Sequence, residues 1–160
     1  MLFVSWSLLI QFTKNNYHMQ ASEEELRTKR HVVHHLHLHL VFVTKYRRKV
    51  FTEEMYERLH FHFDRVCRDF GCRLVECNGE RDHVHLLIEP LPQTTPSRLV
   101  NSLKGVSSRM LRREFPELES YYWKGGLWSP SYFIASCAGA PLDILKAYIR
   151  NQGQVLISRP

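Results

Sequence analysis

The stretch "HHLHLHLVFVT", residues 34–44, alternates in character along most of its length. Leu36, Leu38, Leu40 and Phe42 fall on one side of an extended chain, and His35, His37, His39, Val41 and Val43 fall on the other. A period of two residues is typical of a β-strand with one face in a core. We therefore expect a strand over 34–44 whose leucine face is buried and whose histidine face is open.

A second run, "ERDHVHLLIEP" at residues 80–90, has the same alternation. His83, His85 and Leu87 fall on one side, and Val84, Leu86 and Ile88 fall on the other. We expect a strand over 83–89, paired with an earlier strand over 72–77. The Asn78-Gly79 pair between them is a strong signal for a hairpin turn.

The other expected elements are helical apart from one late strand. They are a helix from Thr52, a candidate N-cap, to Gly71, a helix over Ser97–Arg113, a strand over 131–137 and a helix from Pro141 to Gln152. The resulting order of strand, helix, strand, strand, helix, strand predicts an α+β, ferredoxin-like (RRM-like) fold with an additional C-terminal helix. Its antiparallel sheet would carry helices on one face, with the two histidine strands as central neighbours. We expect residues 1–30 to be a poorly ordered extension and 31–160 to be one domain.

The charge balance points to a polyanionic partner. The chain has 22 Lys and Arg against 16 Asp and Glu, a formal net charge of +6 and a pI near 9.3. Between Leu26 and Val50 there are seven basic residues and no acidic one. No segment has the pattern of an amphipathic membrane helix, so nucleic acid is a better candidate than a membrane surface.

The opening apolar run and the cysteines favour a cytoplasmic protein. The run "MLFVSWSLLIQF" is too short to span a bilayer, which takes about 20 residues, and no basic residues precede it as in a secretory leader. The four cysteines form no CxxC pair, so we expect free thiols.

Spacing alone leaves the histidine chemistry open. Two histidines at positions i and i+2 of a strand point the same way, with β-carbons about 6.5–7 Å apart, so two imidazoles can meet on one metal ion. His83 and His85 meet this condition, and His35, His37 and His39 meet it equally well.

A wider pattern separates the two runs. The landmarks, in chain order, are "HLVFVTKYRRKVF" (39–51), "ERDHVHLLIEP" (80–90), "SLKGVSSRMLRREFP" (102–116), "LWSPSYFIASCAG" (127–139) and "LKAYIRNQ" (145–152). Together they resemble the single-tyrosine HUH transposases, which mobilise small insertion sequences as single-stranded DNA. The resemblance implies that Tyr148 is the nucleophile and that His83, His85 and Gln152 bind a divalent ion, Mg²⁺ or Mn²⁺. It further implies a 5′-phosphotyrosine intermediate, hairpin DNA at the element ends and a homodimer.

The physical pattern agrees with that resemblance. Tyr148 and Gln152 are four residues apart on the expected last helix, so both side chains leave the same face. For this helix taken alone, a tyrosine that packs its ring and keeps its hydroxyl in water is the simpler interpretation. If His83 and His85 are the metal ligands, His37 and His39 would lie next to them and would either bind DNA or orient the ligands through hydrogen bonds.

Basic and aromatic side chains supply the candidate DNA contacts. The candidates for phosphate binding are Lys45, Arg47, Arg48, Lys49, Lys104 and Arg109. Trp123, Trp128 and Tyr132 are candidates either for stacking unpaired bases or for core packing. Two other functions fit the same fold: a non-catalytic module that binds single-stranded nucleic acid, and a domesticated HUH nuclease that cuts repeated hairpins.

Overall fold

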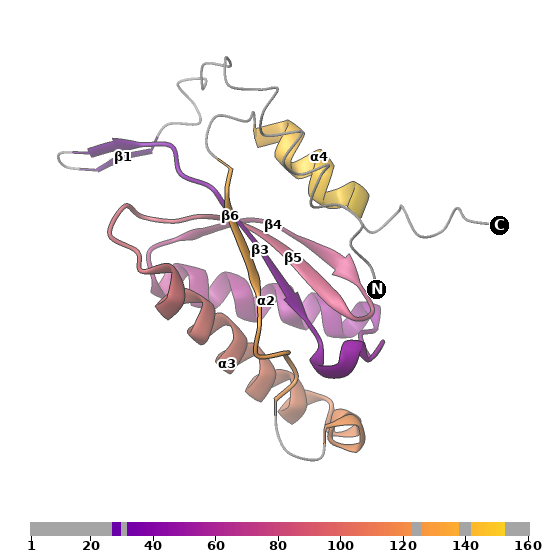
Figure 1. Cartoon of the computed structure of the whole chain (residues 1–160). Coiled ribbons are helices and arrows are strands. Elements are labelled where there is room, and N and C mark those ends of the chain that lie inside the picture. Colours follow the sequence, from indigo (N-terminus) through magenta and orange to yellow (C-terminus); the bar gives the residue numbers. More distant parts are fainter. Residues whose placement is uncertain (1–26, 30–31, 123–125, 138–141, 153–160) are drawn as a thin grey trace.

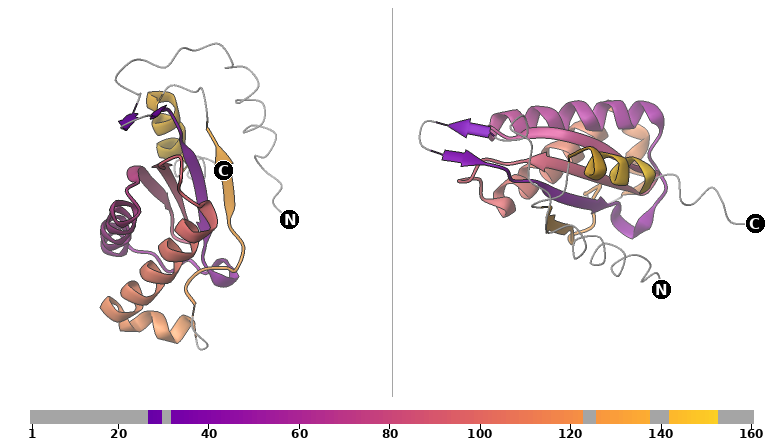
Figure 2. Two further views of the ribbon diagram at one scale, coloured as in Figure 1. Left: turned by 90° about the vertical axis from the view of Figure 1, so that its left-hand side faces the viewer. Right: turned by 90° about the horizontal axis from the view of Figure 1, so that it is seen from above.

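The computed structural model describes residues 27–29, 32–122, 126–137 and 142–152. Its centre is a four-stranded antiparallel sheet in the order β4-β5-β3-β6. The strands are β3 (Leu38–Val43), β4 (Arg73–Glu80), β5 (His83–Glu89) and β6 (Phe133–Ser136). Helices α2 (Glu53–Asp69) and α3 (Pro96–Glu114) cover one face of the sheet, and α4 (Leu142–Gln152) lies against the other (Figures 1 and 2). The predicted ferredoxin-like order, with the two histidine strands at the centre, is confirmed.

The apolar faces of the central strands form the core together with α2 and α3. Leu40 and Phe42 of β3 and Leu86 of β5 are fully buried in it. The leucine face is therefore buried, as predicted. Helix α2 begins as expected, because the Thr52 hydroxyl accepts a hydrogen bond from the Met55 main-chain N–H (3.3 Å).

The expectation that the histidine face is open is wrong. His37, His39 and His85 are also buried, and Ile149 of α4 packs on that face against Leu87.

The first predicted strand is shorter than the pattern suggested. Residues 35–37 lie outside any strand, and β2 (Val32–His34) instead pairs with β1 (Arg27–Lys29) in a separate two-stranded sheet. The pairing of β3 with both neighbours begins at Leu38, opposite Ile88 and Ser136. One further main-chain hydrogen bond extends beyond it, from the Cys137 N–H to the His37 carbonyl oxygen (2.9 Å). Strand β1 lies within the segment that was expected to be an extension, and residues 1–26 are outside the described residues.

The predicted turn at Asn78-Gly79 is wrong. Strand β4 continues through both residues to Glu80, and the turn consists of Arg81 and Asp82. Gly79 pairs with Val84, and a β-carbon on Gly79 would lie only 2.2 Å from the His83 carbonyl oxygen. The glycine therefore allows β4 and β5 to approach closely and does not form the turn.

Two short 3₁₀ segments complete the described fold: η2 (Lys45–Arg47), directly after β3, and η3 (Pro116–Tyr121), after α3. All four cysteines are free, as expected. Within the part of the chain that the structure describes, no helix is long and apolar enough to cross a bilayer.

Candidate active site

His83 and His85 lie next to each other on β5, on the sheet face opposite to α2 and α3. Their ring centroids are 5.1 Å apart and their planes meet at 78°. The strand dictates this placement, because Val84 between them points into the core and is fully buried. Both imidazoles are thus presented to the same side by the shortest spacing a strand allows.

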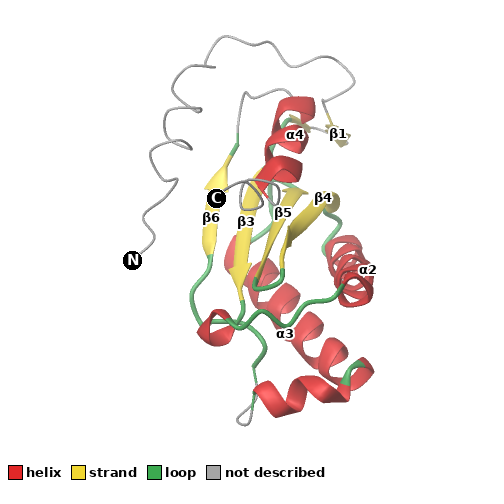
Figure 3. Cartoon of the chain, turned by 90° about the vertical axis from the view of Figure 1, so that its right-hand side faces the viewer, coloured by secondary structure: helices red, strands yellow, loops and turns green. Residues whose placement is uncertain are grey.

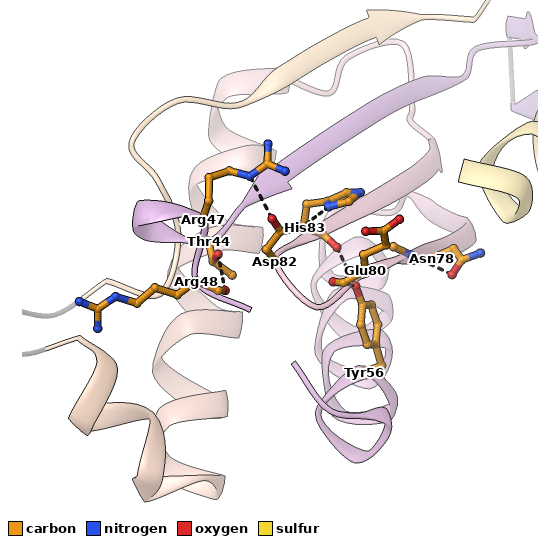
Figure 4. Close-up of polar contacts among 9 residues, drawn as sticks. Thr44, Arg47, Arg48, Tyr56, Asn78, Glu80, Asp82 and His83 are labelled. Carbon is orange, nitrogen blue, oxygen red and sulfur yellow. Dashed lines mark hydrogen bonds and ion pairs between the residues drawn. The ribbon is translucent and has the colours of Figure 1, made fainter. Parts of the chain in front are cut away.

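Asp82 holds the first of these histidines. The carboxylate Oδ1 accepts a hydrogen bond from His83 Nδ1 (2.7 Å), and its Oδ2 accepts one from Arg47 Nε (3.0 Å), as Figure 4 shows. Burial raises the pKa of Asp82, but the His83 hydrogen bond and the Arg47 charge outweigh it and leave the pKa below its usual value. An ionised Asp82 fixes the His83 proton on Nδ1 and leaves Nε2 available.

His39 of β3 holds the second histidine. His39 Nε2 and His85 Nδ1 are 2.9 Å apart, and the two rings stack with centroids 5.2 Å apart. Burial lowers the pKa of His39 to about 4. The pKa of His85 is lowered to about 3, mainly by burial and further by charge repulsion from the nearby His39 and His83. Both rings are therefore neutral at physiological pH. If His85 Nδ1–H donates to His39, then His85 Nε2 keeps its lone pair for a ligand.

These two histidines fit a divalent metal ion. Each has its Nδ1 engaged by a neighbouring group, which leaves two Nε2 atoms on one face. Within the described residues, Glu80, Asp82 and His83 also bring one donor atom each within 4.8 Å of one another. Carboxylate oxygens beside His83 are compatible with a hard ion such as Mg²⁺ or Mn²⁺, although both Asp82 oxygens are already engaged by His83 and Arg47.

The sequence interpretation overlooked Glu80 and Asp82. The run "ERDH" places both carboxylates within three residues of His83, and a two-residue turn folds them beside it. His37, expected behind the ligands together with His39, is buried. Its ring meets that of His35 at a centroid distance of 4.8 Å, while His39 is the one that contacts His85.

Helix α4 lies on the sheet face opposite to α2 and α3 (Figure 3), and its contact with Leu87 places it on the face of the histidine pair. Ile149 is 1% exposed and packs against Leu87, two residues after His85 and on the same side of β5. The Arg150 guanidinium forms an ion pair with Glu76 of β4 (2.9 Å). The helix is thus held on the sheet of its own chain, close to the histidines.

The predicted nucleophile and third ligand are on this helix. Tyr148 and Gln152 both fall within α4, and Tyr148 directly precedes the residue that anchors the helix. For these two residues the structure describes the helical backbone but not the side chains.

The predicted DNA contacts divide between two sides of the molecule. Arg47, Arg48 and Lys49 are exposed in the segment that follows β3, and Lys45 there is half-buried. Arg47 contacts Asp82 beside the histidines. Arg48 also donates a hydrogen bond to the Tyr121 carbonyl oxygen.

Lys104 and Arg109 lie on α3, in the helical layer on the other side of the sheet. Arg109 is exposed. Lys104 is half-buried, and its ammonium donates to the carbonyl oxygens of Ser129 (2.6 Å) and Pro130 (2.9 Å), so it stabilises the segment before β6.

The aromatic candidates have different environments. Trp128 is a core residue, 6% exposed, whose indole N–H donates to the Ser107 hydroxyl (2.9 Å). Tyr132 is 40% exposed and has the Lys104 ammonium 5.7 Å from its ring centroid. Trp123 lies outside the described residues.

Comparison with known proteins supplies the family. The model of the family described as "Transposase IS200 like" matches residues 32–152. This chain belongs to the IS200-like transposase family. The ISDra2 transposase TnpA of Deinococcus radiodurans is 31% identical over 128 residues, which cover 80% of this chain and 91% of that protein. The transposase of insertion sequence IS200 from Salmonella typhimurium is 31% identical over 114 residues, 71% of this chain and 74% of the relative.

Solved structures agree with that membership. A crystal structure described as that of a transposase from Deinococcus radiodurans R1 has a TM-score of 0.65 and 33% identity, and covers 79% of this chain and 98% of its own. A REP-associated tyrosine transposase, solved with a REP hairpin, shares the fold with a TM-score of 0.51 and 11% identity, over 77% of this chain and 67% of its own.

Proposed function

We propose that this IS200-like transposase cleaves and rejoins single-stranded DNA through a covalent 5′-phosphotyrosine on Tyr148. The observation that supports the proposal most strongly is the histidine pair itself. His83 and His85 share one sheet face with their Nδ1 atoms engaged, and α4, which carries Tyr148, is held on that same face.

The proposed reaction is a transesterification. The Tyr148 oxygen attacks a backbone phosphorus, the phenolic proton leaves to solvent, and the bond from phosphorus to the 3′ oxygen breaks. The products are a 5′-phosphotyrosine and a free 3′-hydroxyl. Attack by another 3′-hydroxyl on the phosphotyrosine later rejoins the strand, so the cycle needs no nucleotide cofactor.

The metal ligands in this proposal are His83, His85 and Gln152. When bound, Mg²⁺ or Mn²⁺ would polarise the scissile phosphate and stabilise charge on the leaving oxygen. Asp82 and His39 act as positioning residues, because each fixes the tautomer of one histidine. The His37 ring contacts that of His35, and the expected role of His37 behind the ligands remains a prediction.

Family membership also supports the proposed partners. We propose a homodimer that recognises hairpins at the ends of its own insertion sequence. Lys45, Arg47, Arg48 and Lys49 are the proposed phosphate contacts in the segment after β3, where Arg47 lies next to Asp82 and the histidines. Lys104 and Arg109 remain predictions for a DNA path along α3.

The experiment is a cleavage assay on labelled single-stranded DNA from the flanks of the gene, with and without Mn²⁺. Wild type is expected to form a slow, protease-sensitive covalent adduct on a denaturing gel, only with metal. Tyr148→Phe is expected to abolish the adduct, and Tyr132→Phe, at an exposed tyrosine outside the proposed site, is expected to retain it.

Three results would contradict the proposal and favour another function or another nucleophile. DNA binding without adduct or cut strand would favour a non-catalytic binding module. An adduct that survives Tyr148→Phe would assign another nucleophile. Cleavage of repeated chromosomal hairpins, with no joining of element ends, would favour a domesticated nuclease.

A further inference from the structure

Tyr46 is the most exposed of the large hydrophobic side chains in the described residues, at 72% of its surface. It lies in η2, directly after β3, in a left-handed backbone conformation with a φ of 63°, and Arg47 follows with a φ of 55°. A non-glycine residue in this region costs free energy, so two in succession persist only where surrounding contacts enforce them.

The contacts that enforce this conformation come from the active-site turn. The Thr44 main-chain N–H donates to the Asp82 carbonyl oxygen (2.8 Å), and Arg47 Nε donates to the Asp82 carboxylate (3.0 Å). The Thr44 hydroxyl closes the loop by donating to the Arg48 carbonyl oxygen (2.8 Å), as Figure 4 shows. Since Asp82 also holds His83, the backbone that displays Tyr46 is fixed to the metal-site histidine.

The charges around the ring indicate what it meets. Lys45 Nζ lies 5.2 Å and the Arg48 guanidinium carbon 5.6 Å from the Tyr46 ring centroid. The segment "TKYRRK", residues 44–49, contains no acidic residue. An exposed ring with two cations close to it suits an unpaired base, whose flat face stacks on the ring while its flanking phosphates draw the cations to themselves.

We propose that Tyr46 is a stacking platform for one unpaired base of single-stranded DNA, next to the proposed cleavage site. The inference rests on the proposed function for its choice of DNA as ligand. The inference adds a residue to the basic residues proposed above. The Tyr46 ring would contact a base, whereas the neighbouring cations would contact phosphates.

The test compares variants that separate the ring from the backbone. Tyr46→Phe keeps the ring, whereas Tyr46→Asn removes it with a residue that tolerates the left-handed conformation. Phe61→Ala, which removes an aromatic ring that is 46% exposed on α2, is the matched control. The measurement is the Kd for labelled single-stranded DNA from the gene's flanks and for the matching duplex, by fluorescence anisotropy at one fixed salt concentration.

We expect Tyr46→Asn to weaken single-strand binding by roughly 5- to 100-fold, the usual range for loss of one stacked base. Duplex binding should change by less than about twofold, because paired bases do not stack on the ring. Tyr46→Phe and Phe61→Ala should bind single strands like wild type. Equal losses on single strand and duplex, or no loss on either, would overturn the proposal. A sedimentation measurement in which Tyr46→Asn converts a dimer to a monomer, with unchanged DNA affinity, would also overturn it. That result would show that the ring contacts a second protein chain and not DNA.

The metal-dependent adduct distinguishes this inference from the proposed function. At saturating DNA, Tyr46→Asn should still form the Tyr148 adduct. If wild type binds single strands through Tyr46 yet forms no adduct, the proposed reaction fails and the base contact stands. If wild type forms the adduct and Tyr46→Asn binds DNA unchanged, the base contact fails and the reaction stands.

Discussion

Gly79→Ala should be among the most destabilising single substitutions in this fold, although it adds only one methyl group. Its β-carbon would lie 2.2 Å from the His83 carbonyl oxygen and 2.8 Å from Val84 Cα. A carbon normally stays beyond about 3.3 Å from such an oxygen, so the overlap is about 1 Å. Both of these atoms belong to the backbone of β5 and cannot swing aside as the end of a side chain would.

The expected cost follows from the overlap. Overpacking typically costs about 1–3 kcal/mol, and more where backbone has to move. We therefore expect Gly79→Ala to lower the free energy of unfolding by about 3 kcal/mol or more. For a slope of about 2 kcal/mol/M, the urea midpoint would fall by about 1.5 M.

Gly105→Ala is the matched control, since its β-carbon would meet no atom within 4 Å in the middle of α3. This substitution should raise the free energy of unfolding by about 0.5–1 kcal/mol, because alanine favours a helix over glycine. Gly79→Asn separates packing from a turn: a left-handed turn tolerates asparagine better than alanine, whereas the close approach predicts a severe loss for both. A change of less than about 0.5 kcal/mol for Gly79→Ala would refute the reasoning.

Three further predictions concern other parts of the molecule. Asp82→Asn should weaken Mn²⁺ binding by roughly 10- to 100-fold in calorimetry, because an amide has one oxygen and cannot accept from both His83 and Arg47 as the carboxylate does. Asp64→Asn on α2 is the control, and equal Mn²⁺ affinities for the two variants would contradict the positioning role of Asp82. Glu114 has its pKa lowered from 4.5 to about 2, mainly by the Arg58 hydrogen bond, so its stabilisation is present above about pH 4.5 and disappears as the pH falls toward about 2. Glu114→Gln should thus cost about 1–2 kcal/mol at pH 7, allowing for solvent screening, and the difference from wild type should shrink in urea melts at pH 3; a constant difference would argue against it. Ile149→Ala should speed hydrogen exchange in α4 while leaving that of β3 unchanged, since this side chain packs in a small cluster separate from the main core; a uniform change across the chain would show that the two unfold together.

Local patterns predicted the core of this fold because they depend on neighbouring residues alone. The alternation in β3 and β5 correctly separated the side chains into two faces and assigned Leu40, Phe42 and Leu86 to the core, since a strand turns successive side chains to opposite faces. The expected open histidine face is wrong, because His37, His39 and His85 are buried and α4 packs on that face. The N-cap at Thr52 was recognised for a similar reason, because its hydroxyl bonds to a main-chain N–H only three residues away.

The same reasoning misjudged contacts between distant segments. Asn78-Gly79 resembles a turn, yet the turn is at Arg81 and Asp82. Gly79 instead lies within β4, where Tyr56 of α2 and the β5 backbone leave no room for a side chain, and neither contact can be read from the local sequence. The long histidine run was likewise expected to be one strand, but within the described residues its pairing with β5 and β6 begins at Leu38, and His34 pairs with β1 instead.

The site divides in the same way. The sequence alone determined that His83 and His85 share one strand face and that Tyr148 and Gln152 share one helix, because the periods of strands and helices set both relations. Only the tertiary structure decided that His39 holds His85, that Asp82 ties His83 to Arg47, and that Ile149 keeps α4 on the histidine face. These contacts join residues up to 62 positions apart (Leu87 to Ile149), and no local period specifies which distant side chains will meet.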